Sequence, residues 1–235
     1  MESMKNGFVI STEHLVKKFP VGKGEFTALN GIDLDIGLGE FAGLIGPSGS
    51  GKTTLLNIIG SLDVPSSGEA TVLDRQVSML TAKEAARLRK ESIGFIFQSY
   101  NLLAVHTVYE NVEFPLLLLK ITPAERKKMV LDALEWVKLT DRIKYKPPQL
   151  SGGECQRVAI ARAMVKKPSL VLADEPTANL DAANSHNILK TMEDLNREFK
   201  TTFLFATHDE KVISYLRRKI FLIDGRIDRD ELKPN

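Results

Sequence analysis

The chain has 235 residues, of which 43% are hydrophobic and 26% are charged, and its formal net charge is +2. This length suits one large domain or a core with a subdomain, and the composition is ordinary for a globular protein. The near-neutral charge leaves no electrostatic footprint for nucleic acid, so we expect no nucleic-acid partner.

The sequence also bounds the compartment. Its lone cysteine, Cys155, excludes an internal disulfide and fits a reducing cytosol. Residues 1–7 lack the apolar core of a signal peptide, and no apolar run approaches the roughly 20 residues that cross a bilayer. We therefore expect a cytoplasmic protein, and if a membrane is involved, another polypeptide spans it.

Residues 1–40 predict short strands separated by turns. Residues 8–10 are apolar, and residues 32–36 alternate between apolar and acidic side chains, as a half-buried strand does. Residues 26–29 lie between these two strands, after a Gly-containing turn at 22–24.

From residue 41 the pattern changes to strand, loop and helix, the beginning of an α/β core. The apolar run 41–45 predicts a buried strand, and residues 54–59 continue as a helix. Between them, residues 46–53 read Gly-Pro-Ser-Gly-Ser-Gly-Lys-Thr, the G-x-x-x-x-G-K-[ST] spacing of a loop that wraps a nucleotide triphosphate. The alternative, a surface turn rich in Gly and Ser, leaves the flanking strand and helix unexplained.

This loop has the chemistry of a phosphate site. Its glycines let consecutive N–H groups point at one anion, and the following helix adds the favourable end of its dipole. Lys52 supplies a point charge for the outer phosphates, and the Thr53 hydroxyl is placed for Mg²⁺. The residues expected to bind the nucleotide here are Gly46, Ser48, Gly49, Ser50, Gly51, Lys52, Thr53 and Thr54.

A helical segment then interrupts the α/β pattern. Residues 68–73 and 93–97 read as strands, whereas helical signals dominate from about 107 to 165. Residues 122–125 are typical of a helix start, with Thr as the cap and Pro at the first position. The α/β alternation resumes over strand 169–173, helix 182–199, strand 202–206 and the hairpin 219–227, whose Asp-Gly turn favours type I′ geometry.

Residues 170–175 form an apolar strand that ends in two carboxylates. We expect this strand to lie beside the strand that precedes the phosphate loop, which places Asp174 at the Mg²⁺ ion. Glu175 is then able to accept a hydrogen bond from a water in line with the γ-phosphate, and it is the candidate general base. The alternative is that Asp-Glu-Pro simply ends a buried strand in solvent.

Residues 150–157 read Leu-Ser-Gly-Gly-Glu-Cys-Gln-Arg ahead of an apolar-periodic helix. Ser151 and the two glycines after it give a second helix N-terminus with free N–H groups and a hydroxyl, and hence a second anion site. One nucleotide in one chain has no obvious need for two such sites on different segments.

Residues 150–154 nearly reproduce LSGGQ, the signature of the ATP-binding cassette (ABC) ATPases, and the chain resembles that family over almost its whole length. The resemblance implies an α/β fold, in which a P-loop NTPase core carries an N-terminal antiparallel β-subdomain and an inserted α-helical signature subdomain. It implies one ABC ATPase domain over 1–235, with the core and β-subdomain in 1–97 and 166–235 and the helical subdomain in 98–165.

In that family two subunits pair head to tail, and the signature of one closes on the γ-phosphate held by the other. The resemblance therefore implies ATP and Mg²⁺ as cofactors and a homodimer in the ATP-bound state, with Ser151, Gly152 and Gly153 contacting the nucleotide. Glu154 stands where Gln is more usual and adds an acidic group near the dimer seam. Because the donor positions before it are intact, we expect the phosphate contact to survive.

Further positions match family motifs in the family's order. Gln98 matches the Q-loop glutamine, which contacts Mg²⁺ and the attacking water, and His208 matches the histidine that contacts the γ-phosphate. Phe19 lies where the family places the aromatic that stacks on adenine, and Asn179 and Asp181 match the loop that crosses the dimer interface. Each position also has a plainer alternative. Gln98 could be a loop amide that faces water, and His208 could cap the following helix. Phe19 could be a core aromatic, and Asn179 and Asp181 could be turn and cap residues.

The resemblance thus implies an active centre of stated composition. The catalytic residues are Glu175, His208 and Gln98, and the metal ligands are Thr53, Gln98 and Asp174.

Within the family, the insertion before Ala28 and the run 173–181 look like the lipoprotein-releasing (LolD) and macrolide-export (MacB) branch. The resemblance implies an ATP-hydrolysing motor, peripheral on the cytoplasmic face of the inner or plasma membrane, that drives a separate transmembrane permease for lipoprotein release or export. Residues 116–119 and 105–109 are candidates for the docking face, and the alternative for at least two of the leucines is subdomain core.

Two other functions stay open. One is an ABC ATPase that regulates a membrane or division partner without transport. The other is a module that binds ATP without hydrolysing it, against which the presence of Glu175 and His208 argues.

Overall fold

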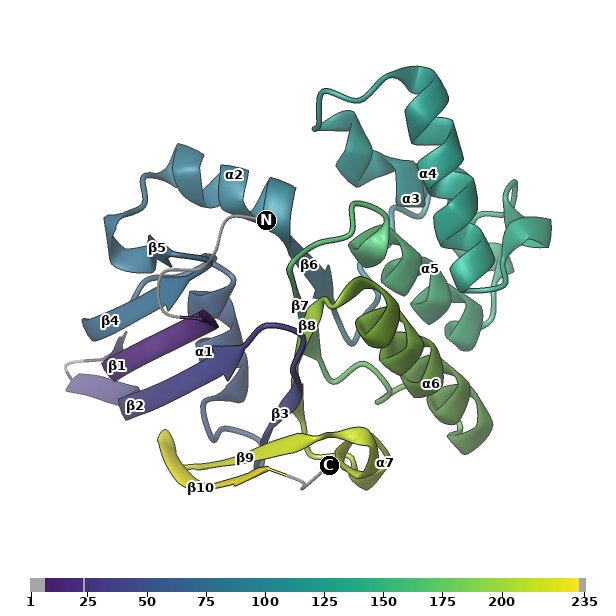
Figure 1. The fold of residues 1–235 in the computed structure, drawn as a ribbon. Helices are drawn as coiled ribbons and strands as arrows, with labels where there is room; N and C mark the ends of the chain where they lie inside the picture. The colour runs from purple at the N-terminus through teal and green to yellow at the C-terminus, as the bar shows by residue number, and fades with distance from the viewer. Residues whose placement is uncertain (1–6, 23, 233–235) are drawn as a thin grey trace.

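The computed structural model describes residues 7–22 and 24–232, and within them the strands form two sheets (Figure 1). The antiparallel sheet has the order β2-β1-β4-β5, with strands β1 (Phe8–Val21), β2 (Gly24–Gly37), β4 (Ser67–Val72) and β5 (Arg75–Gln76). The larger sheet has the order β10-β9-β3-β8-β7-β6, with strands β3 (Phe41–Ile45), β6 (Ile93–Ile96), β7 (Leu170–Asp174), β8 (Thr202–Thr207), β9 (Arg218–Ile223) and β10 (Arg226–Leu232).

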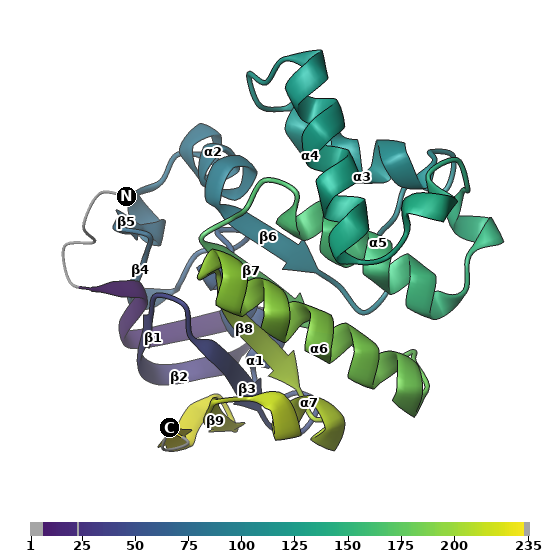
Figure 2. The same ribbon diagram turned by 45° about the vertical axis from the view of Figure 1, so that its right-hand side comes forward.

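The helices cover both faces of the larger sheet. Helix α1 packs between the two sheets, and α5 and α6 lie on the opposite face, with α3 and α4 stacked beyond α5 (Figures 1 and 2). The helices are α1 (Lys52–Ile59), α2 (Ala82–Ser92), α3 (Val108–Leu117), α4 (Pro123–Trp136), α5 (Gly152–Met164), α6 (Ala182–Phe199) and α7 (Glu210–Tyr215). Each face of the sheet therefore buries its own apolar cluster.

The N-terminal strands are longer than the sequence predicts. The short apolar runs belong to two 14-residue strands, β1 and β2, which pair from Phe8 opposite Gly37 to Val21 opposite Gly24. The alternation in β2 is confirmed, because Ile32, Leu34 and Ile36 are buried while the acidic residues between them are exposed. The expected turn includes Lys23, which lies outside the described residues.

The larger sheet corrects one expectation about strand order. Strands β3, β8, β7 and β6 are parallel, so their carboxyl ends meet at one edge. The strand that ends in Asp174, β7, does not lie beside β3, because β8 is inserted between them. All six residues of β8 are buried, as expected for a strand covered on both faces in the middle of a parallel sheet.

Local signals placed most of the later elements correctly. Helix α4 begins after Thr122, whose side chain accepts a hydrogen bond from the Glu125 N–H, and α6 spans the predicted residues. Asp224 and Gly225 both have positive φ, 47° and 71°, as a type I′ turn requires. Helix α2 was not predicted, because it buries none of its residues and so has no apolar periodicity to find.

One buried amide ties the elements around β3 together. Asn196 of α6 donates from Nδ2 to the carbonyl oxygens of Gly39 (3.0 Å) and Thr201 (2.7 Å), and its Oδ1 accepts from Arg217. Its side chain therefore joins α6 to the turn before β3, to the residue before β8 and to the residue before β9.

We expect Asn196→Ala to lower the free energy of unfolding by about 2–3 kcal/mol, because several buried polar groups lose their partner at once. Urea denaturation followed by circular dichroism measures the loss. Asn187→Ala, an exposed site on the same helix, is the matched control and should change stability by less than about 0.5 kcal/mol. Equal effects of the two substitutions would contradict the role given to Asn196.

Candidate active site

The loop between β3 and α1 is pressed against the strands behind it. A Cβ on Gly46 would lie 2.1 Å from the Leu222 carbonyl oxygen, so only glycine fits there. Gly51 has φ 103°, and a Cβ there would lie 2.6 Å from the Ala28 carbonyl oxygen. These two contacts fold the loop into a tight curl at the N-terminus of α1, as the sequence predicts for a phosphate-binding loop.

Lys52, the first residue of α1, is buried in the loop. Its Nζ donates to the carbonyl oxygens of Gly46 (2.7 Å) and Pro47 (2.8 Å). Burial lowers the pKa of Lys52, while the charges of Glu175 and Asp174 act in the opposite direction. The ammonium is thus held inside the curl, where an incoming anion would replace the carbonyl oxygens as its partner.

Asp174, the last residue of β7, contacts the start of α1. Thr53 Oγ1 donates to Asp174 Oδ2 at 3.1 Å, so the two expected metal ligands meet although their strands are not neighbours. Burial raises the pKa of Asp174, and the Thr53 hydroxyl partly offsets this. A hydroxyl and a carboxylate form an oxygen donor set of the kind that Mg²⁺ prefers.

A protein-only metal cage is absent from the described residues, which hold no group of three or more His, Cys, Asp or Glu side chains placed for a metal ion. Mg²⁺ is usually held by one or two carboxylates together with substrate phosphates and water. The pair Thr53 and Asp174 beside a phosphate loop fits that pattern.

Glu175 and His208 are brought together by β7 and β8. Glu175 Oε1 lies 2.6 Å from His208 Nδ1, and Glu175 Oε2 accepts a hydrogen bond from Thr207 Oγ1 at 3.1 Å. The backbone of Glu175 has φ 45°, and its N–H donates to the Ala206 carbonyl at 2.9 Å. Both carboxylate oxygens are therefore fixed, so the alternative of a strand end loose in solvent is wrong.

The helix-cap alternative for His208 is also wrong. The N-terminus of α7 is capped by Asp209, whose side chain accepts from the Lys211 N–H at 3.0 Å. Thr207 is a site residue that the sequence reasoning missed. No motif marks it, and only the end of the buried strand β8 could have suggested it.

Gln98 follows β6, and its side chain is exposed. Its backbone carbonyl accepts a hydrogen bond from Asn179 Nδ2 at 3.0 Å. Among the described residues, the side chain of Gln98 makes no hydrogen bond with Thr53 or Asp174, so its place at the metal ion stays a prediction. The contact with Asn179 joins the segments after β6 and β7.

Phe19 lies at the surface near the end of β1, and the alternative of a core aromatic is therefore wrong. The Lys17 ammonium lies 5.0 Å from the centroid of the Phe19 ring. Phe26 of β2 stands directly opposite in the strand register and is also exposed. The ring is thus available for stacking, and its contact with adenine stays a prediction.

The Ser151 corner begins α5 and is built differently from the expectation. Ser151 caps the helix, and its Oγ donates to Glu154 Oε2 at 2.9 Å, so the hydroxyl is not free. The Ser151 N–H donates to the same oxygen at 2.8 Å. Glu154 Oε1 accepts from Arg142 Nε at 3.1 Å, so its charge is paired and is not simply added to the surface.

The Ser151 corner and the phosphate loop lie at the starts of two different helices, α5 and α1. Within residues 7–22 and 24–232, no hydrogen bond or ion pair joins residues 151–153 to residues 46–54. The first N–H groups of α5 have no partner inside the helix. The two helix starts that the sequence predicts as anion sites are therefore not joined by hydrogen bonds or ion pairs within the described part of one chain.

The family described as "ABC transporter" matches residues 29–178, which is more than half of the chain. The chain belongs to the ABC transporter family. Its cassette is an ABC ATPase, the ATP-hydrolysing subunit of a transporter.

Relatives and solved structures agree with this. The chain is 46% identical to the ABC transporter ATP-binding protein YvrO of Bacillus subtilis, over 95% of this chain and 97% of that protein. It is 43% identical to the lipoprotein-releasing system ATP-binding protein LolD of Pseudoalteromonas translucida, over 94% and 96%. It is 42% identical to the macrolide export ATP-binding/permease protein MacB of Burkholderia pseudomallei, over 97% of this chain but 35% of that protein.

The ATP-binding cassette MJ0796 was solved as a dimer in a post-hydrolysis state bound to ADP and Pi. Its chain superposes on this ABC ATPase with a TM-score of 0.89 at 39% identity, over 96% of this chain and 99% of that chain. The α/β cassette fold predicted from the sequence is therefore confirmed.

We expect Lys52→Ala to weaken ATP binding at least about tenfold, because the site loses the only charge placed inside the loop's curl while the loop keeps its glycines. Titration with a fluorescent ATP analogue measures the affinity. Lys83→Ala, at an exposed position of α2, is the control and should bind like the unsubstituted chain. An unchanged affinity in the Lys52 variant would reject this loop as the phosphate site.

Proposed function

We propose that this ABC ATPase is a motor that binds MgATP, dimerises head to tail and hydrolyses the nucleotide to drive a separate membrane permease. The observation that carries the proposal is the Glu175 carboxylate, fixed by Thr207 and His208 at the edge where Lys52 and Asp174 also lie. A phosphate loop alone serves many nucleotide-binding proteins. A positioned carboxylate beside it supports hydrolysis.

The residues around the loop divide the work of binding. The N–H groups of residues 48–54 and the Lys52 ammonium would hold the outer phosphates, and Phe19 would stack on adenine. Thr53, Asp174 and Gln98 would hold Mg²⁺, which when bound neutralises charge on the phosphates. These assignments need no metal cage built from protein alone.

The reaction itself needs positioning more than covalent chemistry. Glu175 orients the attacking water in line with the γ-phosphate and accepts its proton as the O–P bond forms. Thr207 and His208 keep the two carboxylate oxygens in place. His208 would also contact the departing phosphate. The lost bond between the β- and γ-phosphates releases ADP and phosphate.

The second half of the site comes from another copy in this proposal. Ser151, Gly152 and Gly153 of one protomer close on the γ-phosphate bound by its partner. The lack of hydrogen bonds and ion pairs between corner and loop within the described part of one chain supports this arrangement, as does the dimer found for MJ0796. ATP then favours the closed dimer, hydrolysis removes the link, and the cycle becomes a mechanical switch.

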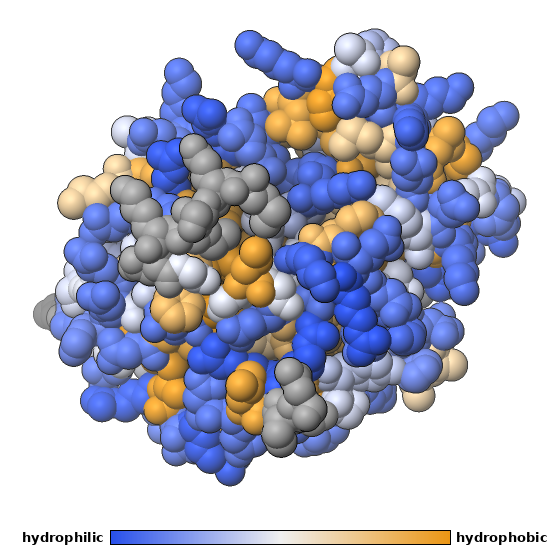
Figure 3. All heavy atoms as spheres, viewed as in Figure 1, coloured by the Kyte–Doolittle hydropathy of each residue, from blue (hydrophilic) through white to orange (hydrophobic). Residues whose placement is uncertain are grey.

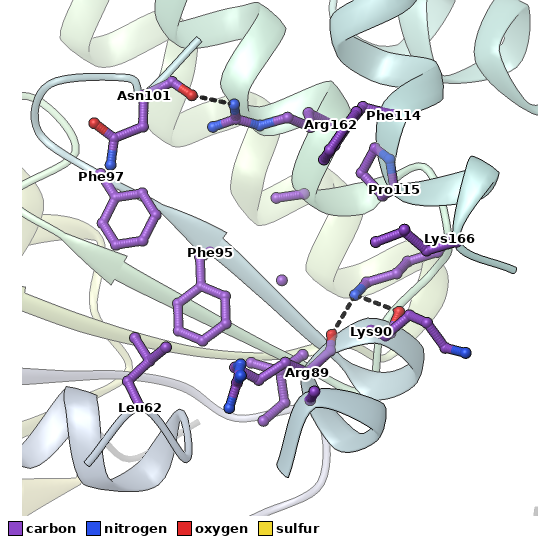
Figure 4. Close-up of a pocket in the computed structure, with 15 residues that line it drawn as sticks. Leu62, Arg89, Lys90, Phe95, Phe97, Asn101, Phe114, Pro115, Arg162 and Lys166 are labelled. Atoms are coloured by element: carbon purple, nitrogen blue, oxygen red, sulfur yellow. Dashed lines mark hydrogen bonds between the residues drawn. The ribbon is translucent and has the colours of Figure 1, made fainter. Parts of the chain in front are cut away.

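A groove beside the site supports a permease as the partner. Its volume is about 490 Å³, and apolar side chains of β6 and α3 line it (Figure 4). Cationic side chains also line it, Arg89 and Lys90 from α2, Arg162 from α5, and Lys166 just after α5. Phe114 and Leu118 reach it from α3 and the residue after that helix, and Phe97 lies on its other side. We propose that residues 98–165 form a helical subdomain and that the groove between it and the core takes an apolar segment of the permease.

The expected docking face is narrower than the sequence indicates. Leu116 is fully buried, and Leu119 packs against the core. These two leucines therefore fit the alternative that at least two of the four belong to the subdomain core. Leu117 and Leu118 are 54% and 55% exposed, and only Leu118 lines the groove. Figure 3 shows apolar side chains gathered over this end of the α3–α4 region.

The relatives support a branch of the family and a location. Likeness to LolD over nearly all of both chains supports lipoprotein release, and likeness to the cassette part of MacB supports export. No described helix is both long enough and apolar enough to span a bilayer. We therefore propose a peripheral position on the cytoplasmic face of the membrane, with the permease supplying the spans.

We expect Glu175→Gln to bind ATP normally but to release phosphate about 10²–10⁴ times more slowly, because the amide orients water without accepting its proton. Steady-state phosphate release gives the rate, and light scattering after size-exclusion chromatography shows a dimer trapped by ATP. Glu210→Gln, exposed on α7, is the control with ordinary turnover. Unchanged turnover in the Glu175 variant would remove that residue as the base.

We expect Leu118→Asp to abolish co-purification with the permease from detergent-solubilised membranes, because a carboxylate would replace the apolar side chain against which the permease segment is proposed to pack. The isolated chain should keep its ATPase rate. Leu117→Asp is the matched control, since this neighbour is equally exposed but does not line the groove. If both variants retain the permease, the groove is not its docking site.

A further inference from the structure

Arg142 is bound to the corner that the proposed dimer uses, although no motif marks it. It ends a short 3-10 helix, Thr140–Arg142, and its Nε donates to Glu154 Oε1 at 3.1 Å. The other Glu154 oxygen accepts the N–H and the hydroxyl of Ser151. Arg142 therefore contacts Ser151 through a single intervening side chain, that of Glu154, and Ser151 is the residue that would meet the partner's nucleotide.

Glu154 creates an electrostatic conflict at this corner. A helix N-terminus with free N–H groups favours one anion. Here a carboxylate already occupies the first turn of α5, and the pKa of Glu154 is lowered, first by the hydrogen bond from the Ser151 N–H, so the group is ionised at neutral pH. An unpaired carboxylate would repel a γ-phosphate brought to Ser151 and Gly153.

Two neighbours besides Glu154 hold the Arg142 guanidinium in place. Its Nη1 lies 2.8 Å from Asp141 Oδ2, and its guanidinium lies 5.0 Å from the centroid of the Tyr145 ring. Tyr145 in turn is anchored, because its carbonyl accepts the Val108 N–H at the start of α3 and its own N–H donates to Arg142. The guanidinium thus has three neighbours, namely the Asp141 carboxylate, the Tyr145 ring and Glu154.

We propose that Arg142 is a positioning residue of the shared nucleotide site, which neutralises Glu154 so that the Ser151 corner accepts the phosphate held by the partner copy. This inference rests on the proposed head-to-tail dimer. It predicts that Arg142 matters only as long as residue 154 carries a negative charge.

A charge-removal cycle tests this. In the Glu175→Gln chain, we measure by light scattering the ATP concentration that gives half-maximal dimerisation. We expect Arg142→Gln to raise this ATP concentration about tenfold, because the Glu154 carboxylate then lies unpaired close to the negatively charged phosphate. In the Glu154→Gln background the same change should shift it by less than about twofold, and Arg142→Lys, which keeps the charge, should dimerise close to the unsubstituted level.

Two controls separate charge from structure. Arg126→Gln breaks a similar ion pair, Arg126 to Glu113 at 3.2 Å, elsewhere among the helices and should leave dimerisation unchanged. Binding of a fluorescent ATP analogue to each monomer should be the same in all variants, because the analogue binds to the chain's own loop. Higher salt should shrink the Arg142→Gln effect by screening.

The outcomes are distinct. An equal effect of Arg142→Gln with Glu or Gln at 154 would show that Arg142 only holds the fold, and it would overturn the inference while leaving the dimer intact. If Arg142→Gln has no effect in either background, the inference is also overturned. A chain that stays monomeric in saturating ATP with Arg142 intact would overturn the dimer itself, and the inference with it.

Discussion

The parallel pairing of β3, β8 and β7 is the constraint on which the rest of the site depends. In this register Ile45 stands opposite Thr207, and Asp174 stands opposite Ala206, so the residues after all three strands emerge at one edge of the sheet. The phosphate loop, the two carboxylates and His208 come from widely separated parts of the chain. Only the shared strand direction and the shared ends bring them within hydrogen-bonding reach.

Much of this could be predicted because its signals are local. The loop before α1 is fixed by glycines that pack against backbone oxygen atoms, and such positions leave a spacing that the sequence shows directly. The same holds for the cap at Thr122 and for the Asp-Gly turn, where a few adjacent residues decide the backbone. The order of the strands is different, because β8 enters between β3 and β7 through pairings that no local periodicity records.

The Ser151 corner shows where reading by motif stops. The sequence has Glu at position 154 in place of the usual Gln. In the structure Ser151 and Glu154 form a capping box, a motif in which Gln and Glu are both suitable. The helix start therefore tolerates the change. Its electrostatic partner, Arg142, ends a short 3-10 helix that no sequence motif marks, and only the folded chain shows that the two charges meet. A residue that balances a departure from a motif is hard to find from the motif alone.

The C-terminal hairpin has a consequence for how the molecule is made. Gly46 packs closely against the Leu222 carbonyl oxygen, and the Gly225 N–H donates to the Ser50 carbonyl oxygen. Strand β3 pairs only with β8 and β9, which come from the last part of the chain. On the ribosome, the segment that carries the glycine loop is thus finished long before its supports exist. Until β8 and β9 have emerged from the exit tunnel, the loop lacks the strands that hold its glycines in place.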